Sequence, residues 1–231
     1  MKTAEDFLSG QVLLIDKPLH WSSFKVVNHL RWAIRNTFNI KKIKVGHAGT
    51  LDPLATGLLV ICTGKMTKQI DTFQGQIKEY IGKFELGSTT PSYDLETEID
   101  NYFPTEHITE KLIHDTTRQF VGDIQQIPPV FSAIKKDGQR LYKFARQGEE
   151  VEIEPRTVNI QEFEITKIDG NAINFRVVCS KGTYIRSLAN DFGKALNSGA
   201  HLSALRRTKI GDFNVSEAIT VEDFTKSLSL S

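Results

Sequence analysis

Cysteine is scarce in this chain, and long apolar runs are missing from it. Among 231 residues only Cys62 and Cys179 are cysteines, and each stands beside apolar residues. This pattern predicts two buried thiols in a reducing compartment, with a disulfide as the less favoured alternative. No run of about 18 apolar residues occurs and no apolar core follows the N-terminal residues, so neither a membrane-spanning helix nor a signal peptide is predicted. We therefore expect a cytoplasmic protein.

Several catalytic and metal-binding patterns are also missing. The six histidines are scattered and neither an HxxxH nor a CxxC spacing occurs, so no metal site is predicted. No Gly-x-Ser-x-Gly elbow is present, which argues against that class of serine hydrolase. The stretch from Gly57 to Lys65 is a poor match to a phosphate-binding loop, because its glycines are too far apart and Met66 stands where serine or threonine would hold magnesium.

Acidic residues are absent between Lys17 and Leu51, although the net charge of the whole chain is only +1. Segregated charge can give a nearly neutral protein one positive face, which is typical of nucleic-acid binding. The alternative, that each cluster is simply solvated surface, stays equally open. The basic clusters are Lys17, Lys25, Arg31, Arg35, Lys41, Lys42 and Lys44; Lys135, Lys136, Arg140, Lys143 and Arg146; and Arg206, Arg207 and Lys209, while acidic residues gather in 94–115 and 149–154.

The apolar pattern predicts a mixture of helices and strands. With 39% hydrophobic and 25% charged residues the composition is that of an ordinary globular protein. An Asp-Gly-Asn turn at 169–171 between two alternating runs predicts a β-hairpin. No regular βαβ repeat occurs, so we expect an α+β fold. Strands are expected at 11–15, 58–62, 79–87, 158–168 and 172–179, and helices after Ser22 or Ser23, after Thr109 and over 183–196.

The most informative segment is 46–59, in which three glycines and a proline frame a single carboxylate, Asp52. An isolated Asp-Pro pair is usually only a turn. Here the whole run, GHAGTLDPLATGLL, resembles the catalytic loop of the TruB-type pseudouridine synthases, which reads roughly GHxGTLDPxAxGxL.

The resemblance extends over nearly the whole chain. One departure is Phe131, which stands where the family usually has tyrosine. Another is Thr90-Pro91-Ser92, which replaces a Thr-Asp-Thr sequence, although Asp94 falls on the aspartate that follows it. The matching segments are 12–18, 78–80, 126–133, 141–142, 145–148, 179–186, 199–202 and 205–208.

The resemblance implies a pseudouridine synthase fold, in which a long mixed, mostly antiparallel sheet is flanked by helices and crossed by a central active-site cleft. We expect one catalytic domain over residues 1–231, with its core at about 10–215 and a C-terminal tail over 216–231. Bacterial members often carry a C-terminal RNA-binding domain of the PUA type. Only 16 residues follow Val215, too few for a full domain of that kind.

The resemblance also implies the reaction, which is isomerisation of uridine 55 in the T-loop of tRNA. The C1′–N1 bond breaks, the uracil turns, and the base is rejoined through C5, so no cofactor is expected. Asp52 would be the catalytic carboxylate, Arg186 would pair with it, and Tyr80 would stack on the target base. Whether Asp52 attacks C1′, attacks C6 or removes a proton stays open at this point.

The expected partner is the T stem-loop of tRNA, with the target base turned out of its stack. His47 is a candidate wedge for the vacated space, and Asp94 and Tyr184 are further candidates for RNA contact. We expect no membrane, no obligate protein partner and a monomer. The rival hypothesis is a non-catalytic RNA-binding or RNA-folding protein. Phosphate contacts are expected from Lys17, Lys41, Lys42 and Lys44.

Overall fold

The computed structural model describes residues 2–132, 135–136, 139–140, 144 and 151–229. The chain divides into two compact units, of which unit 1 comprises 1–80 and 205–231 and unit 2 comprises 81–204. One domain is expected from the sequence, whereas the structure distinguishes these two units, and each is described by itself. The motif residues 133, 141–142 and 145–148, Lys143 and Arg146 lie outside the described residues, as do the side chains of Lys135, Lys136 and Arg140.

Unit 1 is built around the antiparallel pair of β1 and β3, which runs from Val12 opposite Cys62 to Lys17 opposite Gly57. β14 pairs with β1 in parallel, β12 pairs with β3 in parallel, and β2 pairs with β3 antiparallel. The elements of unit 1 are α1 (Ala4–Ser9), β1 (Val12–Lys17), α2 (Ser23–Thr37), β2 (Val45–His47), β3 (Ala55–Thr63), the 3-10 helix η1 (Gly64–Gln69), α3 (Ile70–Gly75), β13 (Phe213–Asn214), the 3-10 helix η3 (Val215–Glu217), β14 (Ile219–Thr220) and α7 (Val221–Ser229).

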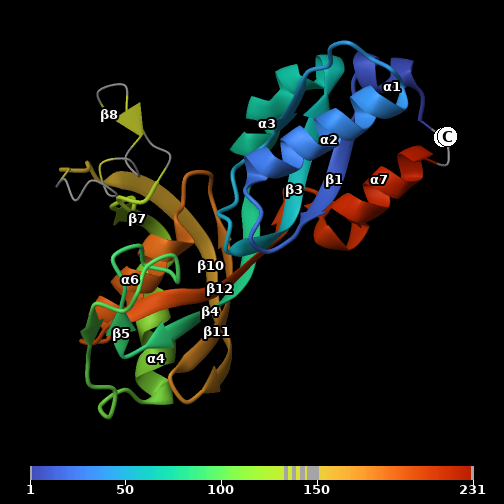
Figure 1. Cartoon of the computed structure of the whole chain (residues 1–231). Coiled ribbons are helices and arrows are strands. Elements are labelled where there is room, and N and C mark those ends of the chain that lie inside the picture. The colour runs from blue at the N-terminus through green and yellow to red at the C-terminus, as the bar shows by residue number, and fades with distance from the viewer. Residues whose placement is uncertain (1, 133–134, 137–138, 141–143, 145–150, 230–231) are drawn as a thin grey trace. The chain divides into compact units, whose positions relative to one another are not determined.

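Helices α2 and α7 lie beside the β1–β3 pair and share a hydrophobic core with it (Figure 1). The side chains of β1 alternate in burial, so that Leu13 and Ile15 point into this core. Leu30 of α2 and Phe224 of α7 meet them, and the ring of Phe224 lies 6.3 Å from that of Phe7 in an edge-on contact. Each such side chain contributes about 1.5–3 kcal/mol when fully buried.

Unit 2 is organised around the hairpin of β10 and β11, with β7 paired to the other side of β10. The hairpin turns at Gly170, whose φ of 59° is left-handed and therefore suits glycine. Its core is a group of phenylalanine rings, of which Phe84 and Phe175 are closest, with centroids 4.1 Å apart. The elements of unit 2 are β5 (Ser88–Thr89), β6 (Asn101–Tyr102), α4 (Glu110–Thr117), the 3-10 helix η2 (Arg118–Phe120), β7 (Gly122–Gln126), β8 (Lys135–Lys136), β9 (Gln139–Arg140), β10 (Arg156–Asp169), β11 (Ala172–Cys179) and α6 (Ile185–Ala195).

The main sheet has the strand order β14-β1-β3-β12-β4-β11-β10-β7 among the described residues, with β2 on β3 and β13 on β12. Strands β4 (Lys78–Leu86) and β12 (Ala200–Ile210) contribute residues to both units. The fold is therefore α+β, with a long mixed, mostly antiparallel sheet and helices packed on it, which confirms the expected fold class. The predicted cleft across its middle stays a prediction.

Most of the expected elements are present. Ser22 caps α2 by accepting a hydrogen bond from the amide of Lys25, and Thr109 caps α4 in the same way. Both caps agree with the sequence-based expectation, because short side-chain oxygens satisfy amides that have no partner at a helix start.

The C-terminal segment differs from the expected tail. Residues 219–229 form β14 and α7, and Val221, Phe224 and Leu228 are buried in the core of unit 1. The helix α1 is also not expected from the sequence, although Thr3 and Asp6 form a reciprocal capping box at its start. Both ends of the described chain are therefore part of the fold of unit 1.

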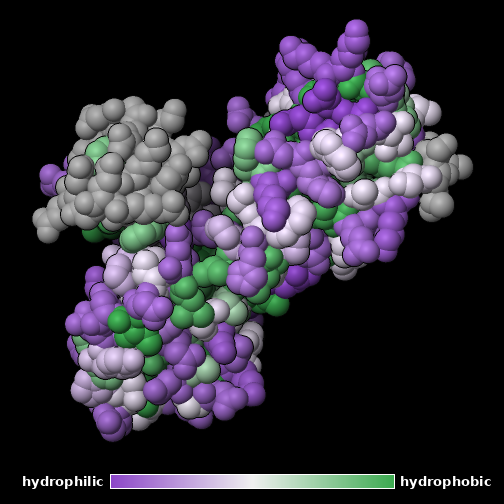
Figure 2. All heavy atoms as spheres, in the orientation of Figure 1, coloured by the Kyte–Doolittle hydropathy of each residue, from purple (hydrophilic) through white to green (hydrophobic). Residues whose placement is uncertain are grey.

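Both cysteine thiols are free and buried, as predicted. Burial raises the pKa of the Cys62 thiol to about 11, so it stays protonated and unreactive at neutral pH. No helix in the described part of the chain is long and apolar enough to cross a membrane. The visible surface of unit 1 is mostly hydrophilic, with hydrophobic residues scattered singly or in small groups (Figure 2).

Candidate active site

Asp52 lies in the loop that joins β2 to β3 in unit 1. The two strands form an antiparallel pair in which His47 stands opposite Ile61. The amide of Ala55 donates to the carbonyl of Asp52 at 3.0 Å, which closes a turn around Pro53. The Asp-Pro pair does make a turn, and that turn holds a half-buried carboxylate.

Ser23, the first residue of α2, fixes this loop beside Asp52. Its hydroxyl donates to the carbonyl of Leu51 at 3.0 Å and accepts from the amide of Leu51 at 2.8 Å. Both residues are buried, so neither main-chain group of Leu51 could turn to water instead. The capping role at this helix start is taken by Ser22, which leaves Ser23 to hold the loop.

Arg207 holds both flanks of the same loop. Its Nε donates to the carbonyl of Leu58 at 2.8 Å, and its NH2 donates to the carbonyl of Gly49 at 3.0 Å. The side chain is fully buried, so the expectation that it forms part of an exposed basic cluster is not supported. Arg207 instead ties the two ends of the Asp52 loop to β12.

The charge of Lys17 interacts with that of Asp52. Its exposed fraction is 0%, and its ammonium group donates to the carbonyls of Pro18 at 3.0 Å and Trp21 at 2.6 Å. Burial lowers the pKa of Lys17 to about 8, with Asp52 acting to raise it and Arg207 to lower it. A lysine this buried lacks the exposure that the predicted phosphate contact requires, so the structure does not support that role.

His47 ends β2 and is half-buried. Burial, followed by the positive charge of Arg207, lowers the pKa of its imidazole. Within the described residues its Nδ1 atom is buried and has no hydrogen-bond partner. The ring is therefore neutral at neutral pH and presents mainly a flat, weakly polar surface.

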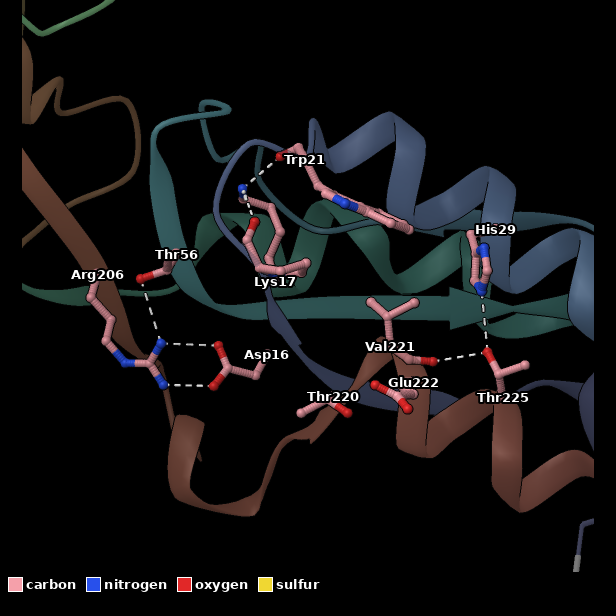
Figure 3. A pocket seen from close by; sticks show the side chains of 11 residues that line it. Asp16, Lys17, Trp21, His29, Thr56, Arg206, Thr220, Val221, Glu222 and Thr225 are labelled. Atoms are coloured by element: carbon pink, nitrogen blue, oxygen red, sulfur yellow. Dashed lines mark hydrogen bonds and ion pairs between the residues drawn. The ribbon is translucent and has the colours of Figure 1, made fainter.

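A cavity of about 680 Å³ opens beside Lys17 in unit 1 (Figure 3). Trp21 and Val221 face each other across it, and the bidentate pair of Arg206 and Asp16, with distances of 2.7 and 3.0 Å, lies at one end. Because Arg206 is engaged by Asp16, it does not offer the free positive charge that the basic cluster at 206–209 suggests.

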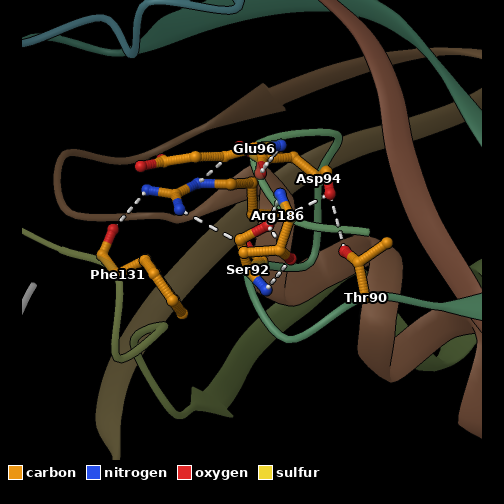
Figure 4. A network of polar contacts seen from close by, with 7 residues as sticks. Thr90, Ser92, Asp94, Glu96, Phe131 and Arg186 are labelled. Carbon is orange, nitrogen blue, oxygen red and sulfur yellow. Dashed lines mark hydrogen bonds and ion pairs between the residues drawn. The ribbon is translucent and has the colours of Figure 1, made fainter. Parts of the chain in front are cut away.

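Arg186 lies in the first turn of α6 in unit 2, and it is only 4% exposed. Its Nε lies 3.6 Å from Asp94, and its NH2 donates to the carbonyl of Phe131 at 3.0 Å (Figure 4). Its NH1 donates to the carbonyl of Ser92 at 3.4 Å. Asp94 is therefore a buried partner of Arg186, and it lacks the exposed carboxylate that the predicted RNA contact requires.

The segment that departs from the family pattern supports this pair. The hydroxyls of Thr90 and Ser92 both donate to the main-chain carbonyl of Asp94, at 2.6 and 3.1 Å. The Asp94 side chain accepts from the amide of Glu96 at 3.0 Å (Figure 4). The substitution of Thr-Pro-Ser for Thr-Asp-Thr thus leaves a well-bonded loop around Asp94.

The remaining predicted residues lie on both units. Tyr80 is buried at the start of β4 in unit 1, and Tyr184 is half-buried at the residue before α6 in unit 2. Lys41, Lys42 and Lys44 are exposed on the segment before β2, on either side of the buried Ile43. These three lysines have the exposure that phosphate contacts need.

No group of histidine, cysteine, aspartate and glutamate that could hold a metal ion occurs among the described residues. The positioning roles of Ser23 and of the buried Arg207 are not apparent from the sequence. The available signals are the second serine at the start of α2, since one serine suffices as a cap, and the place of Arg207 in the matching segment 205–208.

Two family models match consecutive parts of the chain. Residues 35–185 match the TruB family pseudouridylate synthase N-terminal domain, and residues 186–230 match the tRNA pseudouridylate synthase B C-terminal domain.

Curated relatives match the chain over nearly its full length. The chain is 66% identical over 227 residues to tRNA pseudouridine synthase B of Flavobacterium johnsoniae, which covers 98% of this chain and 99% of the relative. It is 56% identical over 223 residues to the protein of the same name from Phocaeicola vulgatus, and the match covers 96% of this chain and 95% of the relative.

Solved structures also resemble it. A chain in the crystal structure of a Cbf5-Nop10-Gar1 complex gives a TM-score of 0.73 at 30% identity, covering 97% of this chain. A chain in the structure of an H/ACA RNP bound to a substrate RNA containing 2′-deoxyuridine gives a TM-score of 0.68 at 29% identity, covering 95% of this chain. This chain spans only 56% and 53% of those two chains.

We predict that Ser23→Ala lowers the free energy of unfolding by about 1–3 kcal/mol, because both main-chain groups of Leu51 lose their partner in a buried site. Urea denaturation followed by circular dichroism measures the change. Ser9→Ala, at the exposed end of α1, is the control and should change it by less than about 0.5 kcal/mol. Equal effects of the two substitutions would show that the Ser23 hydroxyl does not hold the loop.

We also predict a pH signature for Lys17. Because its pKa is lowered to about 8 on folding from an ordinary 10.5, the folded state binds fewer protons than the unfolded state between these values. The free energy of unfolding of the wild type, relative to Lys17→Met, should therefore rise between pH 8 and 10.5 and be flat below pH 8. Parallel urea titrations at pH 6.5, 7.5, 8.5 and 9.5 test this, and a pH-independent difference would contradict the lowered pKa.

Proposed function

Because the chain belongs to the TruB family of pseudouridylate synthases, and is therefore an isomerase that converts uridine to pseudouridine in tRNA, we propose that its target is uridine 55 in the T-loop. The observation that carries the proposal is the Asp52 loop. The half-buried Asp52 stands in a loop that Ser23 and Arg207 hold by its main chain, and its charge interacts with the buried ammonium group of Lys17. Such rigid support is what a catalytic carboxylate needs, since misplacement is costly to the rate.

The chemistry requires that the C1′–N1 bond breaks and a C1′–C5 bond forms, while C5 loses a proton and N1 gains one. No electrons are exchanged with a second compound and no group leaves, so the reaction calls for no cofactor. Asp52 is the proposed carboxylate that acts on the uridine, as a nucleophile at C1′ or C6 or as a base.

Two further residues are proposed to act with Asp52. Arg186 supplies a guanidinium group as the partner of Asp52 in the RNA-bound enzyme, and Asp94 holds that group in unit 2. Tyr80 stacks on the target uracil. The burial of both side chains supports roles within a shielded site rather than in loose surface contacts.

The target base must leave its stack, which costs a few kcal/mol. We assign the neutral ring of His47 to the vacated space, because a flat ring with a lowered pKa can stack there without adding charge. The exposed Lys41, Lys42 and Lys44 are assigned to backbone phosphates, and Tyr184 remains a candidate for RNA contact. The partner is thus the T stem-loop of tRNA.

The proposed setting is the cytoplasm, where the protein would act as a monomer without an obligate protein partner. A role in tRNA folding beside catalysis is compatible with base flipping, because the protein must open the loop to reach the uridine. The same assay that tests catalysis separates the two roles.

We predict that Asp52→Asn lowers turnover on a T-arm transcript by more than about 1,000-fold, or about 4 kcal/mol of transition-state stabilisation, while RNA affinity changes less than threefold. The amide keeps the shape of the carboxylate but is neither a nucleophile nor a base. Mass-spectrometric detection of pseudouridine and filter binding measure the two quantities. Asp71→Asn, on the exposed side of α3, is the control. Turnover of Asp52→Asn within tenfold of wild type would remove Asp52 from the mechanism.

We further predict that replacing Lys41, Lys42 and Lys44 together by glutamine weakens RNA binding and flattens its salt dependence. Removing one phosphate interaction should reduce the slope of log affinity against log salt by about 0.7–0.9. The matched control replaces Lys111, Lys167 and Lys226, each of which is paired with a carboxylate, and removes the same charge. Equal slopes for the two triple variants would place the RNA elsewhere.

A further inference from the structure

Gln126, the last residue of β7, binds both main-chain groups of Tyr184. Its Oε1 accepts from the Tyr184 amide at 2.7 Å, and its Nε2 donates to the Tyr184 carbonyl at 3.1 Å. The orientation of the side-chain amide follows from chemistry, because a main-chain N–H can only donate and a main-chain carbonyl can only accept. Gln126 is 2% exposed, so water does not compete for these bonds.

Tyr184 is the N-cap residue of α6, and no side chain of its own helix caps that end. Its carbonyl also accepts from the amide of Leu188 at 3.0 Å, which is the first hydrogen bond of the helix. Gln126 therefore fixes the position from which α6 starts. A helix start is a place where main-chain groups have no intrahelical partner, so an outside partner there sets the direction of the first turn.

The chain segment that follows Gln126 holds the same turn at further points. The hydroxyl of Ser187 donates to the carbonyl of Ile127 at 2.7 Å, and the NH2 of Arg186 donates to the carbonyl of Phe131 at 3.0 Å. Residues 126–131 thus contact three residues of α6 and its cap, all within one helical turn. Gln126 is the first residue of the matching segment 126–133, and the resemblance by itself assigns it no role.

Arg186 stands two positions after Tyr184, and two of its contacts are long. The distances from its side chain to Asp94 and to the carbonyl of Ser92 are 3.6 and 3.4 Å. Interactions near the limit of hydrogen bonding are broken by small movements of the main chain. The location of the guanidinium group therefore depends in part on how firmly the start of α6 is held.

We propose that Gln126 is a positioning residue for the isomerisation, acting through Tyr184 on the placement of Arg186. This inference rests on the proposed function, because it assumes that Arg186 serves the reaction. It assigns to Gln126 no contact with the uridine. A loss of its two hydrogen bonds should lower turnover and leave RNA binding nearly unchanged.

The substitution Gln126→Glu distinguishes a positioning role from a merely structural one, because its effect should depend on pH. A protonated glutamic acid accepts through its carbonyl and donates through its O–H, so it reproduces both bonds of glutamine. An ionised carboxylate can only accept, so it cannot bond the Tyr184 carbonyl, and its negative charge would lie against the partial negative charge of that carbonyl oxygen. Burial favours the protonated form, so its titration should fall within the working pH range of the enzyme.

The experiment measures kcat and KM of the full chain on a T-arm transcript between pH 5.5 and 8.5. At pH 8.5 we expect kcat of Gln126→Glu to be lower than that of wild type by about 30-fold or more, with KM within about threefold. The ratio should shrink to about fivefold or less at pH 5.5, where the acid is protonated. Gln125→Glu, the exposed neighbour on the same strand, is the control and should follow the wild-type profile at every pH.

Gln126→Met keeps the length of the side chain, loses both bonds, and should show a lowered kcat at every pH without recovery at low pH. Thermal unfolding of each variant shows whether it is folded. Wild-type kcat in both variants, or a change in KM alone, would overturn the proposal. So would failure of both variants to fold, because Gln126 would then support unit 2 as a whole. If the wild type itself is inactive, the proposed function is refuted. If Arg186→Lys is inactive while both Gln126 variants are active, the proposed function stands but Gln126 does not have this role.

Discussion

The hydroxyl of Ser23 makes two hydrogen bonds to one residue, Leu51, and the geometry of the Asp52 loop depends on them. A loop that contains a glycine has many conformations available in the unfolded chain, so holding it costs conformational entropy. The hydroxyl offsets part of that cost, because it satisfies a buried donor and a buried acceptor at once. It also ties the loop to α2, whose apolar face is embedded in the core of unit 1. The position of the carboxylate thus follows from the packing of a helix.

The same device recurs in unit 2, where the amide of Gln126 binds both main-chain groups of Tyr184. In each case a buried polar side chain bonds main chain within two residues of a proposed site residue, Asp52 or Arg186, instead of bonding the side chain of that residue. The main chain beside that residue is thereby fixed. A buried group left without its partner costs more than an ordinary hydrogen bond gains, so such bonds resist loosening.

Local signals in the sequence predict those features of the fold that depend only on neighbouring residues. The caps at Ser22 and Thr109 and the turn at Gly170 depend on neighbouring residues, and all three are confirmed. The helix α7 cannot be found in this way, because its few apolar residues gain their stability from α2 and β1. From the sequence alone Lys17 and Arg207 are expected to be exposed cations, whereas their burial depends on carbonyls that the fold brings from elsewhere in the chain. Among the candidate site residues, Asp52 is prominent through its motif. Of the residues that hold its loop, Ser23 lies outside the matching segments, and Arg207 lies in one of them, 205–208, which by itself assigns it no role.

Gly57 shows why parts of that motif need not touch the substrate. In the sheet it stands between Lys17 of β1 and Arg207 of β12, as the register partner of both. Its φ is 101°, and a Cβ atom there would lie 2.3 Å from the carbonyl oxygen of Arg207. Any larger residue would push β12 away and displace the arginine that binds the carbonyls of Gly49 and Leu58. The glycine is thus required by the parallel pairing of β3 with β12, and its effect on Asp52 is transmitted through Arg207. Asp52 is the one acidic residue within the run 46–59. Gly57, in the same run, acts on the main chain of the loop that holds Asp52.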